Sequence, residues 1–209
     1  MAFGDYVKST TGSASSGDVT VTFTATEGNL LILSGKHDAN QAAPAAPAGW
    51  SVIGLFPGWP AQTRFDYWYR IAGASDTTVT IPYLYTGSTR GIVSEYEFDG
   101  TADPSFSGNV DHTSNSQIDT AETPTGTPNI CIALRSSAWI GGEGTISINE
   151  GYSKDYTGSN EQVCSLVDKV GATQPTFSFT GTNYTRNLGL AVFHGTAGGS
   201  ALPLIMQQM

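Results

Sequence analysis

Short runs in which apolar and polar residues strictly alternate constrain the fold of this chain more than any other feature. The run VTVTFT places Val19, Val21 and Phe23 on one side of an extended segment and three threonines on the other. Successive side chains of a β-strand point to opposite faces, so this pattern predicts a strand with one buried face. The run LLILSG at 30–35 is apolar almost throughout and predicts a strand covered on both faces. With EGN between them, the two runs suggest a first hairpin.

Further segments of strand type follow, separated by turns rich in Gly, Pro, Asp and Ser. They read WSVIGLF, RFDYWYRIA, TTVTIPYLY, RGIVSEYEF, NICIALRS, GTISINE, EQVCSLVDKV, TFSFTG and LGLAVFH. Their spacing is typical of β-sandwiches, and Pro82 marks an edge or a bulge. We therefore predict an all-β fold, a single antiparallel sandwich or jelly roll of about ten strands.

Two stretches of the chain lack this pattern. The segment 99–128 has almost no apolar periodicity, and loops of that length are often functional, so it is a candidate contact surface. The sandwich is predicted to occupy residues 1–195, and residues 196–209 a Gly- and Ser-rich linker with an apolar tail. This tail either folds back or inserts into a neighbouring subunit, and its predicted inter-subunit contacts are Leu202, Leu204, Ile205 and Met206.

The charge of the chain argues against several classes of partner. Nine basic and eighteen acidic side chains give a net charge of −9, without a cluster of Lys or Arg. Binding to nucleic acid depends on cationic contacts with phosphates, and an anionic membrane repels a negative protein, so we expect neither partner. The start of the sequence lacks a secretory pattern, so synthesis in the cytosol is expected.

The two cysteines lie within strand patterns, Cys131 in NICIAL and Cys164 in EQVCSLV. A free Cys often behaves as a small buried hydrophobic residue. Since a cytosolic origin disfavours disulfides, a bond between these two residues is the less favoured alternative.

The densest aromatic run, FDYWYRI, has two faces if it is extended. Phe65, Tyr67, Tyr69 and Ile71 point to one side, and Asp66, Trp68 and Arg70 to the other. The first set is expected in the core, because each aromatic ring buries roughly 150 to 250 Å². For Trp68 we favour a position beneath a loop or a neighbouring chain, with Arg70 reaching Asp66 or another acid. The alternative is a ring that stacks on a sugar.

Glu95 and Glu97 project from the same face of their predicted strand. Two carboxylates can act as the acid and the nucleophile or base of glycoside hydrolysis when they flank a bond in a cleft. Neighbours on one strand more often form a solvated row, so we favour that interpretation.

Metal and cofactor sites find little support in the sequence. His37, His112 and His194 are scattered and do not have zinc-ligand spacing. Asp99 and Asp103 can donate oxygens to calcium, but an Asx turn is the simpler interpretation. We predict no catalytic residue, no metal and no cofactor.

Taken together, several segments resemble a β-sandwich domain that recurs in structural proteins of tailed bacteriophages. The resemblance covers roughly residues 17–195 and includes GDVTVTFTATEGNLLIL and NLGLAVFHG. Its matching positions are Pro47, Ala48, Gly49 and Trp50, then Tyr67, Tyr69, Arg70, Ala72 and Gly73, then Phe98, Asp99, Gly100, Asp103 and Pro104. Phe98 and Asp99 stand where the family usually has Tyr and Ser. These are framework residues and carry no catalytic signature.

The resemblance implies a non-enzymatic virion component, either a capsid decoration protein or a head or tail appendage subunit. Its expected partners are other virion proteins, either major capsid or tail proteins, and further copies of itself. Related domains also occur in bacterial surface proteins. A different function is host recognition by a carbohydrate-binding module, with Trp59, Trp68 and Trp139 as stacking surfaces on a surface glycan. A polysaccharide hydrolase built on Glu95 and Glu97 is the third hypothesis.

Overall fold

β-Strands form all of the regular secondary structure that the computed structural model describes. It describes residues 4–38, 44–56, 63–83, 89–99, 105–112, 118–120, 130–137, 146–148, 151–157, 161–167, 176–179 and 186–193. Within these ranges there is no helix, and therefore none long and apolar enough to cross a bilayer. Neighbouring strands pair antiparallel, and the prediction of an all-β fold is confirmed.

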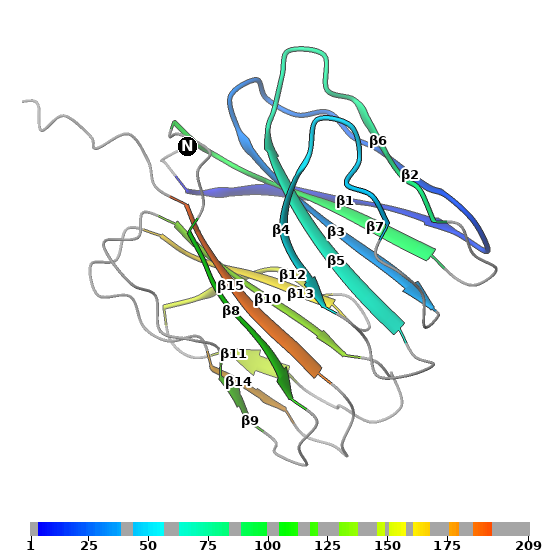
Figure 1. Cartoon of the computed structure of the whole chain (residues 1–209). Coiled ribbons are helices and arrows are strands. Elements are labelled where there is room, and N and C mark those ends of the chain that lie inside the picture. The colour runs from blue at the N-terminus through cyan, green and yellow to red at the C-terminus, as the bar shows by residue number, and fades with distance from the viewer. Residues whose placement is uncertain are drawn as a thin grey trace, which may run out of the picture.

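Four sheets contain these strands (Figure 1). The first sheet has the order β1 (Tyr6–Ala14), β7 (Thr89–Tyr96), β3 (Leu30–Asp38), β5 (Thr63–Ile71) and β4 (Ser51–Phe56). The second sheet has the order β12 (Ser153–Thr157), β13 (Glu161–Val167), β10 (Ile130–Ser137), β15 (Arg186–Phe193) and β8 (Ser105–His112). A small sheet joins β11 (Ile146–Ile148), β14 (Thr176–Phe179) and β9 (Ile118–Thr120). The fourth is a two-stranded ribbon of β2 (Val19–Thr22) and β6 (Thr78–Ile81).

The central strand β3 is covered on both faces. Leu30 and Ile32 point into one hydrophobic cluster, and Leu31 and Leu33 point into another. All four side chains are fully buried, as the uninterrupted apolar run predicted. Burying a side chain of this kind stabilises a fold by about 1.5–3 kcal/mol, so both coverings contribute to the stability of this strand.

The first of these clusters joins the two five-stranded sheets. Its members from the first sheet and the segments beside it are Leu30, Ile32, Ile53, Tyr67, Tyr96 and Phe98, and those from the second sheet are Ile130, Ile132, Ala191 and Phe193. The Phe193 ring meets Tyr69 edge-on, with the ring centroids 5.4 Å apart. At the margins β1 contacts β12, and β4 contacts β8 and β15. We call this cluster the inter-sheet core.

The second cluster lies between the first sheet and the ribbon. Figure 1 shows the ribbon on the side of the first sheet that faces away from β10 and β15. Val19 and Val21 are buried against it, whereas Thr20 and Thr22 are exposed, so the predicted half-buried strand is confirmed. On the outer side, the hydroxyl oxygens of Thr20 and Thr80 are 2.9 Å apart.

Three glycines in register let the ribbon approach the first sheet. Gly12 of β1 pairs with Gly91 of β7, which pairs with Gly35 of β3, and we call these three residues the glycine row. A Cβ at Gly91 would lie 2.8 Å from Cγ2 of Val21. A Cβ at Gly35 would overlap the Tyr83 hydroxyl and lie 2.9 Å from Cζ3 of Trp68. The row is therefore a channel in which side chains from the ribbon and from Tyr83 lie.

The structure departs from the sequence-based predictions in three places. The first predicted hairpin is wrong, because β2 pairs with β6 and lies on the face of the sheet that contains β3. The polar strand β1 was not predicted. The segment 99–128, predicted to lack strands, contains β8 and β9. Pro82 follows directly after β6. Among the described residues β6 pairs with β2 alone, so Pro82 lies beside an edge strand, one of the two positions that were predicted for it.

We predict that Gly35→Ala lowers the free energy of unfolding by about 1–3 kcal/mol, because its methyl group overpacks the channel against Tyr83 and Trp68. The loss should be smaller in a Tyr83→Phe background, which removes the overlapping hydroxyl. Urea denaturation of the four variants of this cycle measures both effects. Gly73→Ala is the matched control, since the nearest atom to its new methyl would be Oδ2 of Asp76 at 3.6 Å. Equal losses at Gly35 and Gly73 would contradict the role of the channel.

Candidate functional site

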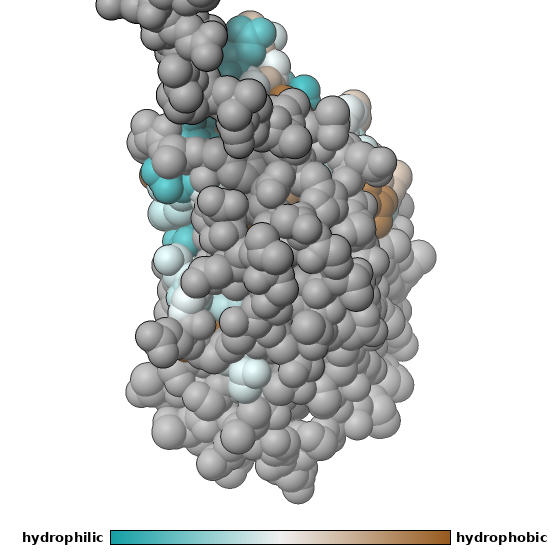
Figure 2. All heavy atoms as spheres, turned by 90° about the vertical axis from the view of Figure 1, so that its left-hand side faces the viewer, coloured by the Kyte–Doolittle hydropathy of each residue, from teal (hydrophilic) through white to brown (hydrophobic). Residues whose placement is uncertain are grey.

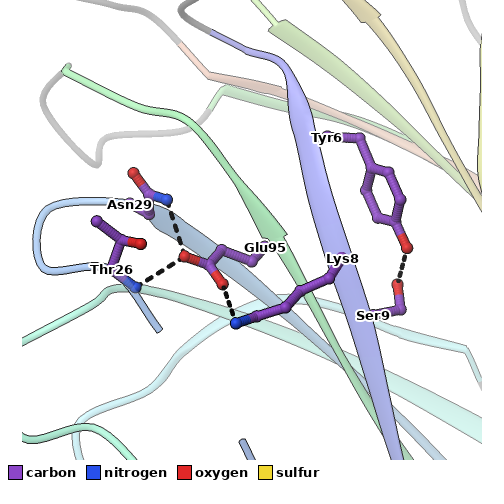
Figure 3. Close-up of polar contacts among 6 residues, drawn as sticks. All are labelled: Tyr6, Lys8, Ser9, Thr26, Asn29 and Glu95. Carbon is purple, nitrogen blue, oxygen red and sulfur yellow. Dashed lines mark hydrogen bonds and ion pairs between the residues drawn. The ribbon is translucent and has the colours of Figure 1, made fainter. Parts of the chain in front are cut away.

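A buried carboxylate ties three segments together at one end of the first sheet (Figure 3). Glu95 on β7 is 2% exposed. Its Oε1 accepts hydrogen bonds from the backbone N–H of Thr26 and from Nδ2 of Asn29, both at 2.8 Å. Its Oε2 lies 3.5 Å from the ammonium nitrogen of Lys8. We call these four residues the Glu95 cluster.

Strand register and one tight turn bring these groups together. Lys8 of β1 is the direct cross-strand partner of Glu95. Thr26 and Asn29 begin and end the turn that leads into β3, in which the Asn29 N–H donates to the Thr26 carbonyl oxygen at 3.1 Å. Gly28 of this turn has a φ of 90°, a left-handed conformation that glycine adopts readily. Two backbone hydrogen bonds hold the same turn to Ala72, from the Gly28 N–H at 2.9 Å and from the Ala72 N–H to the Asn29 carbonyl oxygen at 2.8 Å, and the carboxylate adds an attachment to β7.

The partners of Glu95 give its carboxylate a role in the fold. Both of its oxygens face donors from the same chain. The predicted solvated row is therefore wrong for Glu95, which is buried. Glu97 is only partly buried, and its backbone bonds to Gly4 and Asp5. A hydrolytic pair needs two carboxylates along a cleft, whereas the Glu95 carboxylate is buried against donors of its own chain.

The aromatic run contributes mainly to the two cores. Tyr67 is fully buried in the inter-sheet core, and Tyr69 packs against it. Trp68 is fully buried in the cluster beneath the ribbon, so the hypothesis of a stacking surface is wrong for this ring. The ribbon covers this ring, and the sequence of β5 alone does not reveal that cover. Trp59 and Trp139 lie outside the described residues.

Arg70 takes part in a second polar cluster. Its Nη2 lies 2.9 Å from Oδ2 of Asp76, which also accepts a hydrogen bond from the Gly73 N–H at 2.7 Å. The guanidinium carbon is 5.8 Å from the centroid of the Trp50 ring, a cation–π distance. Arg70 does reach an acid, as expected, but the partner is Asp76. Trp50 is itself buried, so this arrangement stabilises a turn and does not present a ring to a ligand.

Of the remaining predicted site residues, the structure describes only some. Leu202, Leu204, Ile205 and Met206 lie outside the described residues, as do Asp103 and His194. Asp99 is exposed. Among the side chains that the structure does describe, no three His, Cys, Asp or Glu residues are grouped so that they could hold a metal ion.

Cys131 is a buried free thiol on β10. β10 pairs with β13, the strand that contains Cys164. In this register, however, Cys131 is opposite Leu166 and Cys164 is opposite Ala133. Burial raises the pKa of the Cys131 thiol to about 12. The expectation that this residue acts as a small buried hydrophobic group agrees with its surroundings.

Sequence reasoning missed Lys8, Thr26 and Asn29 as partners of Glu95. Lys8 lies in a polar stretch without apolar periodicity, and Thr26 contributes its backbone, which no residue pattern marks. A turn that ends in Gly-Asn directly before an apolar run is the one signal that could have pointed to Asn29.

Comparison of this chain with models of known protein families, with curated proteins and with solved structures finds no match.

We predict that Glu95→Ala lowers the free energy of unfolding by about 3 kcal/mol, because the buried Asn29 amide and the partly buried Thr26 N–H lose a charged acceptor. Lys8→Met should cost less than about 1 kcal/mol, since the Lys8 side chain is 46% exposed and water screens its ion pair. Chemical denaturation of both variants tests this asymmetry. Similar losses for the two would mean that the ion pair, and not the turn, dominates the cluster.

We also predict that Cys131 resists alkylation in the folded protein at about pH 8, because its raised pKa keeps the thiol protonated. An unfolded cysteine ionises near pH 8.5, so alkaline pH favours the unfolded chain and stability falls as pH rises from there toward about 12. Peptide mass spectrometry after timed alkylation distinguishes Cys131 from Cys164. Labelling of Cys131 at the rate of a free thiol would contradict its burial.

Proposed function

We propose that this protein is a non-enzymatic structural subunit of a tailed-bacteriophage virion, a capsid decoration protein or a head or tail appendage. We further propose that its two five-stranded sheets are the halves of one sandwich. The shared core supports this arrangement, as do the margins, where β1 meets β12 and β4 meets β8. In this role the protein is a rigid block that holds neighbouring subunits together.

The observation that carries the proposal is that the framework positions of the resemblance meet one another in space. Pro47 and Trp50 close a turn through a 3.0 Å backbone hydrogen bond, and Gly49 within it has a φ of 77°. Arg70 lies against this turn, since a Cβ at Gly49 would be 3.3 Å from its Nη1. The motif therefore has a physical basis: the turn before β4 docks on β5 through one arginine.

The described surface limits how such a subunit can adhere to its neighbours. Val52 is the one large hydrophobic residue among the described side chains that is strongly exposed, at 49%. On the face shown in Figure 2, the described residues at the upper and left margins are mainly hydrophilic, and a small hydrophobic group lies at the right margin. We assign apolar adhesion to the tail residues Leu204, Ile205 and Met206, whose burial would contribute about 25 cal/mol per Å² of apolar area. The net charge of −9 suits a position away from packaged DNA.

The test of this proposal is whether the protein copurifies with virus particles. We expect it at a fixed copy number in particles banded by density, and expect Ile205→Asp to weaken its attachment at least about tenfold by placing a charge in an apolar contact. Gln207→Asp is the matched control, because it adds the same charge to a polar position of the same tail. A wild-type protein found only outside particles would contradict the proposal.

A further inference from the structure

The first strand, β1, contributes almost no buried side chains to the packing of its sheet. None of the nine residues of β1, all of which the structure describes, is buried. Only Tyr6 packs partly against the inter-sheet core, where its ring meets Tyr96 edge-on. Backbone pairing to β7 runs along the whole strand, and β1 also contacts β2 and β12. A segment with little buried apolar surface belongs to the less stable part of a fold, so β1 is able to detach while the rest of the first sheet stays formed.

The neighbouring strand β7, in contrast, is almost completely buried. Seven of the eight residues of β7 are buried, and Arg90 is partly buried. If β1 left, the backbone N–H and C=O groups along this margin of β7 would lose their strand partners, and an open edge of that kind readily pairs with another strand. β7 is therefore an acceptor that requires a strand in the place of β1.

Specific polar contacts define which strand fits there. The hydroxyl oxygens of Ser9 and Ser94 are 2.8 Å apart, and the Thr89 hydroxyl faces two carbonyl oxygens, that of Gly17 at 3.1 Å and that of Ala14 at 3.4 Å. Lys8 meets Glu95 at the same margin. Gly12 adds a steric condition, because any Cβ there would overlap the Thr20 carbonyl oxygen of the ribbon. A strand with glycine at this position and small hydroxyl residues around it satisfies these conditions.

We propose that β1 is exchanged between copies of this protein, so that β1 of one copy pairs with β7 of another. The occupant is a second copy because its β1 makes every one of these contacts unchanged. The hinge is the four-residue segment 15–18, in which Gly17 has a φ of 72°. An exchanged strand creates adhesion without an exposed apolar patch, which agrees with the hydrophilic described surface. The inference rests on the proposed function, in which neighbouring copies are held at high local concentration.

The other margins of the first sheet and of the ribbon are less suited to exchange. The opposite edge strand β4 holds the buried Ile53 and pairs irregularly with β5 between Val52 and Gly54. β2 is anchored by Val19 and Val21, both almost completely buried. The hinge therefore separates a weakly anchored strand from a strongly anchored one.

The experiment mixes two single-cysteine variants, Ser9→Cys and Ser94→Cys, both in a Cys164→Ser background. The two proteins are unfolded together, refolded at high protein concentration and oxidised. A disulfide between the two chains forms when β1 of one copy lies on β7 of the other, because the two side chains are then as close as Ser9 and Ser94 are in the structure. The buried Cys131 thiol, with a pKa of about 12, reacts too slowly to interfere.

The matched control is a mixture of Thr20→Cys and Thr80→Cys, whose hydroxyl oxygens are also in contact, at 2.9 Å, but which both follow the hinge. We expect covalent heterodimer from the Ser9 and Ser94 mixture in several-fold excess over this control, measured on non-reducing gels. Equal yields from the two mixtures would overturn strand exchange. That result would leave attachment to particles through the tail intact, so failure of this inference and failure of the proposed function are distinguishable.

Discussion

The close approach of the β2–β6 ribbon to the first sheet depends on the absence of side chains along the glycine row. Gly12, Gly91 and Gly35 lie in register on three adjacent strands, and the ribbon lies across them. Because nothing projects from the row, Val21 and Tyr83 reach the sheet backbone, and Trp68 is covered. Glycine weakens a strand in isolation, since it loses much conformational freedom and has no side chain to pack. The two-sided burial of β3 offsets that loss.

The interior of this β-structure also contains a charge, and its placement explains why the charge is tolerated. Removing a carboxylate from water is expensive unless donors replace the water. Glu95 has two hydrogen-bond donors on one oxygen and a cation near the other. Since Lys8 remains half-exposed, only one of the two charges is fully removed from solvent. The cluster therefore ties the turn before β3 to β7 at modest electrostatic cost, and it couples the first strand to both.

Alternation in the sequence predicted which residues are buried better than which strands pair. Val19 and Val21 face inward and Leu30 to Leu33 are covered on both sides, because side-chain direction follows directly from an extended backbone. The pairing of β2 with β6 joins residues about sixty positions apart, and no local pattern carries that information. β1 has no such alternation, because most of its residues are polar or small and none is buried. The burial of Glu95 is not predictable from its own strand, because its partners come from a turn and from β1.

A rigid sheet with one weakly attached margin is the physical claim on which the proposed strand exchange rests. Hydrogen exchange followed by mass spectrometry tests this claim most directly, since it reports the free energy of opening along each strand. We predict that amides of β3 and β7 exchange only through global unfolding, and that amides of β1 that bond to β7 exchange through an opening of lower free energy. Equal protection of β1 and β3 would contradict this picture, because β1 would then be as firmly held as the centre of the sheet.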